Sequence, residues 1–302
     1  MLTIGSRGSQ LALWQARWIQ ARIKGFGVES RIEIIHTTGD KITDVALSKV
    51  GTKGLFTKEI EEALLGGAID LAVHSLKDMP TDLPAGLTLA AIPEREDPRD
   101  ALVGRSLGAL SAKARVGTSS LRRAAQLRAR RPDLEIENIR GNVDTRLRKL
   151  DEGQYDAIVL AAAGLRRLGW ENRITELLDA GVMCPAVGQG ALAVETRKDS
   201  GAAQEIAARL EHRESRIAVT AERAVLRSLG GGCQVPIGAY ATVVGDVVYL
   251  RAIIVSPDGT QMIRKESRGA TSDAERIGGA LGEELLAGGG RQILEAVYDA
   301  AP

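Results

Sequence analysis

The chain has 302 residues, 44% of them hydrophobic and 26% charged, and its formal net charge is +1 at pH 7. This composition excludes a disordered chain, and the near-neutral charge excludes a bulk attraction to nucleic acid or to an anionic membrane. The length suffices for two or three domains, and the longest apolar runs are too short to cross a bilayer. Two cysteines and three histidines predict neither a disulfide framework nor a metal site. Because the N-terminus lacks a secretory apolar segment, we expect a cytoplasmic protein.

The N-terminal part predicts strands that alternate with helices. A strand over residues 2–5 leads into a helix that opens at residues 8–10, and a second strand covers residues 31–36. Arg7 and Ser9 lie at the first strand-to-helix turn, where free backbone N–H groups attract anions. This turn is therefore a candidate anion site.

A polar segment over residues 37–54 follows, with several lysines and two glycines but no clear periodicity. Such a segment is typical of a mobile loop over a binding site, and equally of an ordinary solvated loop. Lys53 and Phe56 lie at its end.

A helix over residues 55–65 precedes a buried strand over residues 69–75, which runs into a sharp turn at Pro80. Ligands of open α/β sheets bind beyond the carboxyl ends of the strands, where Ser75, Lys77 and Asp78 lie. An adjacent Lys–Asp pair is usually a surface ion pair of little energetic weight. In a cationic cleft, however, Asp78 becomes a candidate acid or a group that stabilises a cation.

The charged segment 93–100, which contains two prolines, predicts a crossing into a second α/β unit. Strands over residues 101–103 and 115–117 follow, and then a helix that ends before Pro132. The start of this helix carries hydroxyl and guanidinium groups, an arrangement that suits an anion. These groups belong to Thr118, Ser119, Ser120, Arg122 and Arg123.

Two further strands, over residues 136–139 and 156–163, are also followed by arginines, among them Arg140, Arg146 and Arg167. Between residues 115 and 148 nine arginines stand against four acidic residues, a local excess of five. The arginines could lie on solvated helix faces, but their repeated position just after strands favours an anion-binding surface.

A second crossing over residues 184–194 returns the chain to the first unit, and two crossings imply a hinge and a cleft. A helix over residues 214–229, a three-stranded meander and two helices complete the chain. We therefore expect an α/β fold of two domains joined by a double-crossing hinge, plus a small C-terminal α+β domain. The expected boundaries are 1–93 with 191–212, then 98–186, then 216–302.

Cys233 lies in the segment GGGCQVPIG at residues 230–238, where three glycines allow a bulky group to approach. The thiol could be a nucleophile, a metal ligand, an attachment point or a small apolar side chain. The preceding helix end disfavours a thiolate, and no histidine is near in sequence, so a thiol hydrolase is the weaker interpretation. A covalently anchored group beside a cationic cleft fits better. Two alternatives stay open: a two-lobed binding protein for an anion, and a nucleic-acid binder, which the 3% aromatic content disfavours.

Several segments resemble the signatures of the porphobilinogen deaminase (hydroxymethylbilane synthase) family, and the resemblance spans essentially the whole chain. Departures are small: Ser6 stands where threonine is common, and Asp144 where an uncharged residue is usual. The matching segments are residues 230–238, 73–80 (VHSLKDMP), 117–123 (GTSSLRR), 140–143 (RGNV), 185–190 (PAVGQG), 11–16 (LALWQA) and 53–56 (KGLF).

The resemblance implies a cytoplasmic, monomeric transferase of tetrapyrrole (haem) biosynthesis with two periplasmic-binding-protein-like domains. It would join four porphobilinogen molecules head to tail on a dipyrromethane primer, which Cys233 holds through a thioether. Asp78, Arg7 and Arg140 would be catalytic, and no metal, nucleic acid or membrane would take part. The residues implied to bind cofactor and substrate are Gln15, Ser9, Lys53, Phe56, Ser75, Lys77, Thr118, Ser119, Ser120, Arg122, Arg123, Arg146 and Arg167.

Overall fold

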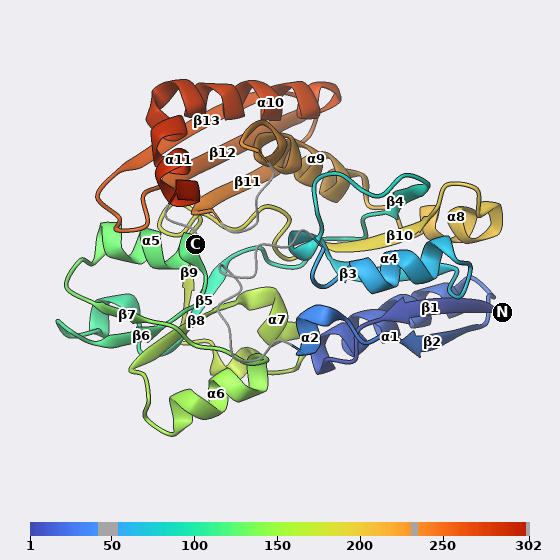
Figure 1. The fold of residues 1–302 in the computed structure, drawn as a ribbon, viewed down its shortest axis with the longest axis horizontal. Coiled ribbons are helices and arrows are strands. Elements are labelled where there is room, and N and C mark those ends of the chain that lie inside the picture. The colour runs from blue at the N-terminus through green and yellow to red at the C-terminus, as the bar shows by residue number, and fades with distance from the viewer. Residues whose placement is uncertain (42–53, 231–234, 300–302) are drawn as a thin grey trace. The chain divides into compact units, whose positions relative to one another are not determined.

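The computed structural model describes residues 1–41, 54–230 and 235–299 (Figure 1). The described residues form two compact units, one of residues 1–41, 54–96 and 190–216 and the other of residues 97–189, 217–230 and 235–299. The chain passes between the units at residues 96–97, 189–190 and 216–217. The expected second and third domains share the second unit in this division, so the three-domain organisation stays a prediction.

The first unit contains a five-stranded mixed sheet in the order β2-β1-β3-β10-β4. β1, β2 and β3 are parallel, whereas β10 runs antiparallel to both of its neighbours. The strands are β1 (Leu2–Ser6), β2 (Ser30–Ile34), β3 (Leu71–Ser75), β4 (Leu87–Ala91) and β10 (Leu192–Arg197).

Each face of this sheet has its own apolar core. On one face, Ile19 and Ile23 of α1 pack with Leu71 and Val73 of β3, and on the other Ile60 and Leu64 of α4 pack with Ala72. Alternate residues of a strand point to opposite faces, which explains how β3 can serve both cores. The helices of this unit are α1 (Gln10–Gly25), α2 (Thr38–Lys41), α4 (Lys58–Leu65), α8 (Gly201–Ala208) and the 3-10 turn η1 (Leu76–Asp78).

The second unit contains another five-stranded mixed sheet, in the order β7-β6-β8-β5-β9. Leu102 and Val116 face the core that Leu127 of α5 completes, while Ile158 and Leu147 belong to a core on the other face. The elements are β5 (Asp100–Gly104), η2 (Leu107–Ala109), β6 (Arg115–Gly117), α5 (Leu121–Arg130), β7 (Glu135–Glu137), α6 (Val143–Asp151), β8 (Ala157–Ala161), α7 (Ala162–Arg167), η3 (Glu171–Arg173) and β9 (Glu176–Leu178).

The C-terminal part of the second unit is the predicted antiparallel meander, covered by helices (Figure 1). Val225 of α9, Leu250 of β12 and Leu281 of α10 are buried in one shared core. The elements are α9 (Arg213–Ser228), β11 (Ile237–Val244), β12 (Val247–Val255), β13 (Met262–Ala270), η4 (Thr271–Asp273), α10 (Ala274–Leu285), η5 (Leu286–Gly290) and α11 (Arg291–Asp299).

Some expected boundaries were wrong. The segment 37–54 opens with the short helix α2, and the strand expected at residues 136–139 lies at Glu135–Glu137. The strand expected at residues 156–163 stops at Ala161, because the chain turns directly into α7. β4 was missed. Its apolar residues alternate weakly, and its pairing partner β10 lies about a hundred residues further along the chain.

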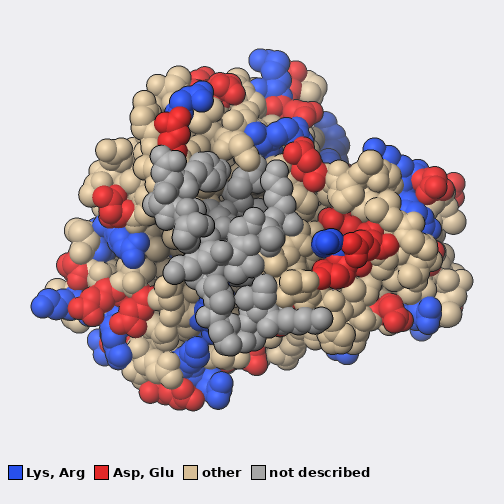
Figure 2. All heavy atoms as spheres, viewed as in Figure 1, with Lys and Arg blue, Asp and Glu red and all other residues tan. Residues whose placement is uncertain are grey.

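The surface carries charges of both signs. On the face shown in Figure 2, Lys and Arg side chains are interspersed with Asp and Glu, as the net charge of +1 implies. No helix in the described part of the chain is long and apolar enough to cross a membrane. Within the same residues, no group of three or more His, Cys, Asp or Glu is placed to hold a metal ion.

Candidate active site

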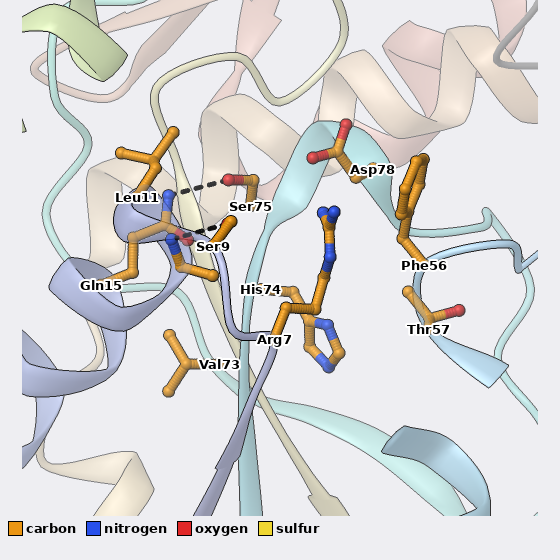
Figure 3. A pocket seen from close by; sticks show the side chains of 11 residues that line it. Arg7, Ser9, Leu11, Gln15, Phe56, Thr57, Val73, His74, Ser75 and Asp78 are labelled. Carbon is orange, nitrogen blue, oxygen red and sulfur yellow. Dashed lines mark hydrogen bonds between the residues drawn. The ribbon is translucent and has the colours of Figure 1, made fainter. Parts of the chain in front are cut away.

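A small pocket of about 70 Å³ lies at the carboxyl ends of β1 and β3 in the first unit (Figure 3). The carboxyl ends of parallel strands and the N-terminus of the following helix meet at this edge of the sheet, so ligands bind there. Six of the residues expected to form the site line this one pocket. The lining residues are Arg7, Ser9, Leu11, Ala12, Gln15, Phe56, Thr57, Val73, His74, Ser75 and Asp78.

Ser9 and Gln15 contribute from α1. Ser9 is the N-cap of this helix, and its Oγ accepts a hydrogen bond from the backbone N–H of Ala12 at 3.3 Å. Gln15 is 2% exposed, and its Nε2 donates to Ser75 Oγ at 2.9 Å. The start of α1 and the end of β3 are therefore joined by side chains as well as by packing.

Arg7 directly follows β1 and is held by two neighbours. Its Nε donates to Asp40 Oδ1 at 3.1 Å, its Nη2 donates to the same oxygen, and its guanidinium lies 4.2 Å from the centre of the Phe56 ring. Asp40 is fixed in turn by the hydroxyl of Thr37, 2.8 Å from Oδ2. Burial alone would raise the pKa of Asp40, but the bonds from Arg7 and Thr37 hold it below its ordinary value.

Asp78 ends the turn η1, three residues beyond the end of β3. Leu76 at the start of the turn and Met79 directly after it are each 1% exposed and anchor the turn in the core. Asp78 is exposed and Lys77 is half-buried. In Figure 3 the carboxylate of Asp78 and the guanidinium of Arg7 point toward the same space. The pocket thus offers a carboxylate and a cation to one small ligand group.

In the second unit, the turn between β6 and α5 is built by hydroxyls. Ser120 caps α5 by accepting from the N–H of Arg123 at 3.4 Å, and Thr118 Oγ1 accepts from the N–H of Ser120 at 3.2 Å. Ser119 is exposed, and its Oγ donates to the carbonyl of Ile139 at 2.6 Å. The predicted helix start is therefore present, and its N–H groups and dipole favour an anion.

Arg122 and Arg123 are buried in a network around Asp100. Arg122 Nη1 donates to Asp100 Oδ2 at 2.7 Å and to the carbonyl of Cys184 at 2.6 Å. Arg123 Nε donates to Asp100 Oδ1 at 2.9 Å, and Gln189 Nε2 donates to the same oxygen at 2.9 Å. Because these arginines are only 4% and 6% exposed, they make most of their hydrogen bonds to groups inside the unit.

Cations also gather where Arg140 and Arg146 follow β7. Arg146 Nε donates to the carbonyl of Gly141 at 2.8 Å. Burial, followed by the charges of Arg123 and Arg140, lowers the pKa of Arg146 to about 10. Arg167 on α7 is 8% exposed. Since neighbouring cations disfavour the charge on Arg146, positive charge is in local excess. A group with several carboxylates fits this cluster.

The expected site residues fall into two sets. The first unit holds one set: Arg7, Ser9, Gln15, Phe56, Ser75, Lys77 and Asp78. The second unit holds the other: Thr118, Ser119, Ser120, Arg122, Arg123, Arg140, Arg146 and Arg167. Cys233 and Lys53 lie outside the described residues. The roles of all these residues stay predictions.

Sequence reasoning missed the acids that hold the arginines. Asp40 lies in the segment interpreted as a loop, and Asp100 in the segment interpreted as a domain crossing. Asp100 directly precedes the apolar residues of β5, and an acid at a strand start is a signal for a buried charge pair. His74 and its partner Glu195 were also missed, although each directly follows three apolar residues of its strand.

The fold and the two residue sets define an α/β protein with arginines and hydroxyl groups gathered at strand ends and helix starts. Residues 2–205 match the family described as "Porphobilinogen deaminase, dipyromethane cofactor binding domain", and residues 216–287 match "Porphobilinogen deaminase, C-terminal domain". The chain therefore belongs to the porphobilinogen deaminase family.

Full-length relatives agree with this assignment. The chain is 51% identical to a porphobilinogen deaminase of Syntrophobacter fumaroxidans, over 99% of both chains. It is 53% identical to another of Trichlorobacter lovleyi, over 98% of this chain and 96% of the relative. A periplasmic substrate-binding protein of an ABC transporter from Coxiella burnetii aligns with 70% of this chain and 92% of its own, at 12% identity and a TM-score of 0.44.

Proposed function

We propose that this chain is a porphobilinogen deaminase that acts in tetrapyrrole biosynthesis. It removes ammonia from four porphobilinogen molecules, joins them head to tail on a covalently bound dipyrromethane, and releases hydroxymethylbilane. One observation carries the proposal: in a chain of this family, Asp78 and Arg7 point into one pocket at the carboxyl end of β3. Family membership also favours this enzyme over a two-lobed binding protein or a thiol hydrolase.

Substrate binding is assigned to the cations and hydroxyls of the site. Each porphobilinogen carries an acetate and a propionate, and guanidinium groups bind such carboxylates by charge-assisted hydrogen bonds. Arg7 offers its charge in the first unit, already oriented by Asp40. Phe56, whose ring lies against the Arg7 guanidinium, provides a flat apolar surface beside it.

Asp78 is assigned the catalytic role. Positive charge develops on the substrate pyrrole as ammonia leaves, and a fixed carboxylate stabilises that charge where it forms. The η1 turn holds Asp78 through its buried neighbours Leu76 and Met79. The same carboxylate can accept hydrogen bonds from pyrrole N–H groups and so orient the ring. Asp78 therefore combines orientation with charge stabilisation.

The cation cluster of the second unit suits the cofactor. When bound, the dipyrromethane supplies the pyrrole ring to which the first substrate is joined. Arg140 and Arg146 would hold its carboxylates, with the α5 N-terminus as a further anion site. The attachment residue is Cys233, by the motif at residues 230–238. It lies outside the described part of the chain, so this assignment rests on the sequence.

The purified protein tests this function directly. From a host that makes porphobilinogen, its intact mass should exceed the sequence mass by one dipyrromethane, and it should convert porphobilinogen to hydroxymethylbilane with release of ammonia. Cys233→Ser should have the unmodified mass and no turnover, whereas Cys184→Ser is the matched control. Cys184 is 2% exposed, and burial raises the pKa of its thiol to about 12, which disfavours the reactive thiolate. An unmodified, inactive wild-type protein would contradict the proposal.

We further propose a monomeric, cytoplasmic enzyme of three domains. The first family match ends at residue 205 and the second begins at residue 216. This supports a boundary there between the segment that returns to the first domain and the C-terminal domain. Light scattering on the purified holoenzyme would give the mass of one chain if the monomer is right. Limited proteolysis should then cut first near residues 205–216.

A further inference from the structure

A buried polar cluster in the first unit has no role assigned in the function proposed above. Its members are His74 on β3, Glu195 on β10 and Glu61 on α4, which are 6%, 0% and 7% exposed. The other inward side chains of α4, Ile60 and Leu64, are apolar and fully buried. Burying carboxyl groups in such surroundings is costly unless they are paired, and the cost points to a use.

The sheet register places two members on the same face. β3 and β10 are antiparallel, with His74 opposite Ala193 and Ala72 opposite Glu195. Residues two apart along a strand share a face, so His74 and Glu195 both point toward the side covered by α4. His74 Nε2 lies 3.1 Å from Glu195 Oε2. Because a carboxylate has no proton to give, Nε2–H is the donor.

Glu61 differs from Glu195 although both are buried. Burial raises the pKa of Glu61, and the nearby charge of Glu195 raises it further. Glu61 thus lies near both His74 and Glu195, the hydrogen-bonded pair of the cluster. In each carboxyl group, Oε1 has no hydrogen-bond partner among the described residues. The cluster is thus one hydrogen-bonded pair with a second carboxyl beside it.

His74 connects this cluster to the pocket. Its side chain lines the pocket together with Arg7 and Asp78, and in Figure 3 its ring lies below Arg7, away from Asp78. β1 and β3 are parallel, with Gly5 paired to Ala72. Two residues further along each strand, Arg7 and His74 fall on the same face. The imidazole therefore lies on the same face of the sheet as Arg7 and lines the same pocket.

We propose that Glu195 is a positioning residue of the deaminase: its hydrogen bond holds the His74 imidazole in place in the lining of the pocket that Arg7 and Asp78 share. The inference rests on the proposed function. Loss of the bond frees the ring, and the pocket that Arg7 and Asp78 line then loses one fixed part of its wall. The carboxylate-binding cluster of Arg140 and Arg146 belongs to the second unit and is unaltered. The variant should accordingly lose kcat with little change in KM.

Two isosteric variants of the holoenzyme test this. Glu195→Gln should lower kcat for porphobilinogen about 10- to 100-fold, the usual cost of a misplaced reacting group, with KM changed by less than about threefold. Glu61→Gln is the matched control, because it changes the other buried carboxyl of the cluster while the bond to His74 comes from Glu195, and its kcat should stay at the wild-type value. A normal kcat for Glu195→Gln, or equal losses in both variants, would overturn the proposal.

A double variant separates positioning from folding. His74→Met with Glu195→Met replaces the buried pair by apolar side chains, so its melting temperature should equal or exceed that of the wild type. Its kcat should still be reduced. Wild-type kcat in this variant would show that the pair is merely structural. An active wild type with an equally active Glu195→Gln refutes the inference alone, whereas an inactive wild type refutes the proposed function and the inference with it.

Discussion

The guanidinium of Arg7 donates hydrogen bonds from Nε and Nη2 to the carboxylate of Asp40, and these bonds hold it in place. Asp40 comes from the short helix α2, 33 residues further along the chain. Thr37 donates to the same carboxylate from its backbone N–H and its hydroxyl. The arginine at the pocket thus has its orientation set by an acid that does not line the pocket.

Replacing Asp40 tests this arrangement. Asp40→Asn keeps the shape but removes the charge that fixes Arg7, so kcat should fall about tenfold. Because the pair is partly exposed, the free energy of unfolding should change by less than about 1 kcal/mol. Asp133→Asn is the control, since Asp133 binds Arg131 through the same two nitrogen atoms, at 2.8 and 2.7 Å, outside the pocket. Similar kinetics for both variants would refute the orienting role.

Removal of the Asp78 carboxylate should stall the reaction without unloading the enzyme. In Asp78→Ala, kcat should fall about 100- to 1000-fold, the range for loss of one preorganised electrostatic group. The intact mass should still include the dipyrromethane, because attachment is assigned to Cys233. Asp199→Ala, in the same unit and with an 88% exposed side chain, should match the wild type. Normal turnover of Asp78→Ala would refute the catalytic assignment.

Asp100 should matter for stability. It is fully buried between Arg122 and Arg123, so Asp100→Asn leaves two buried cations without their counter-charge. The free energy of unfolding, measured in urea, should fall by about 3–5 kcal/mol. Asp97→Asn is the comparison: its partners Arg99 and Arg166 are 40% and 33% exposed, and water can replace the lost bonds. Its cost should stay near about 1 kcal/mol.

The effect of Asp100 should also depend on pH. Burial alone would raise its pKa, but the charges of Arg122 and Arg123 hold it well below the ordinary value of 3.8. A carboxyl group whose pKa is lower in the folded than in the unfolded state stabilises the fold fully at pH values above its unfolded-state pKa. This stabilisation is lost as the pH falls through the folded-state pKa. The stability difference between wild type and Asp100→Asn should therefore be constant from about pH 8 to pH 5 and shrink below about pH 4. A difference that grows on acidification would contradict this assignment.

Arg146 should contribute to anion affinity in a pH-dependent way. Its pKa of about 10 means that the guanidinium begins to lose its proton as the pH approaches 10, so KM for porphobilinogen should rise there. Arg146→Gln should raise KM about tenfold at neutral pH and should lack that alkaline rise. Arg148→Gln, an exposed position on the same helix, is the control and should behave as wild type. An unchanged KM in Arg146→Gln would exclude Arg146 from anion binding.

The sequence by itself determined which segments form the site. Hydrophobic periodicity and turn residues placed β1, α1, β3, β6 and α5 within a few residues, because each carries a local signal. The same signals put Arg7, Asp78 and Ser120 at strand ends and helix starts. The motifs around these positions identified the family before any tertiary contact was known.

Tertiary structure alone decided how those residues are held. The pairs Arg7–Asp40, Arg123–Asp100 and His74–Glu195 span 33, 23 and 121 residues. No local pattern encodes such a pairing, since it depends on strand register and on which face each side chain takes. It also decided that Arg122 and Arg123 are buried, where sequence reasoning expected arginines that meet a ligand. Whether a helix side chain is buried depends on which other elements pack against that helix, and local sequence patterns do not show this.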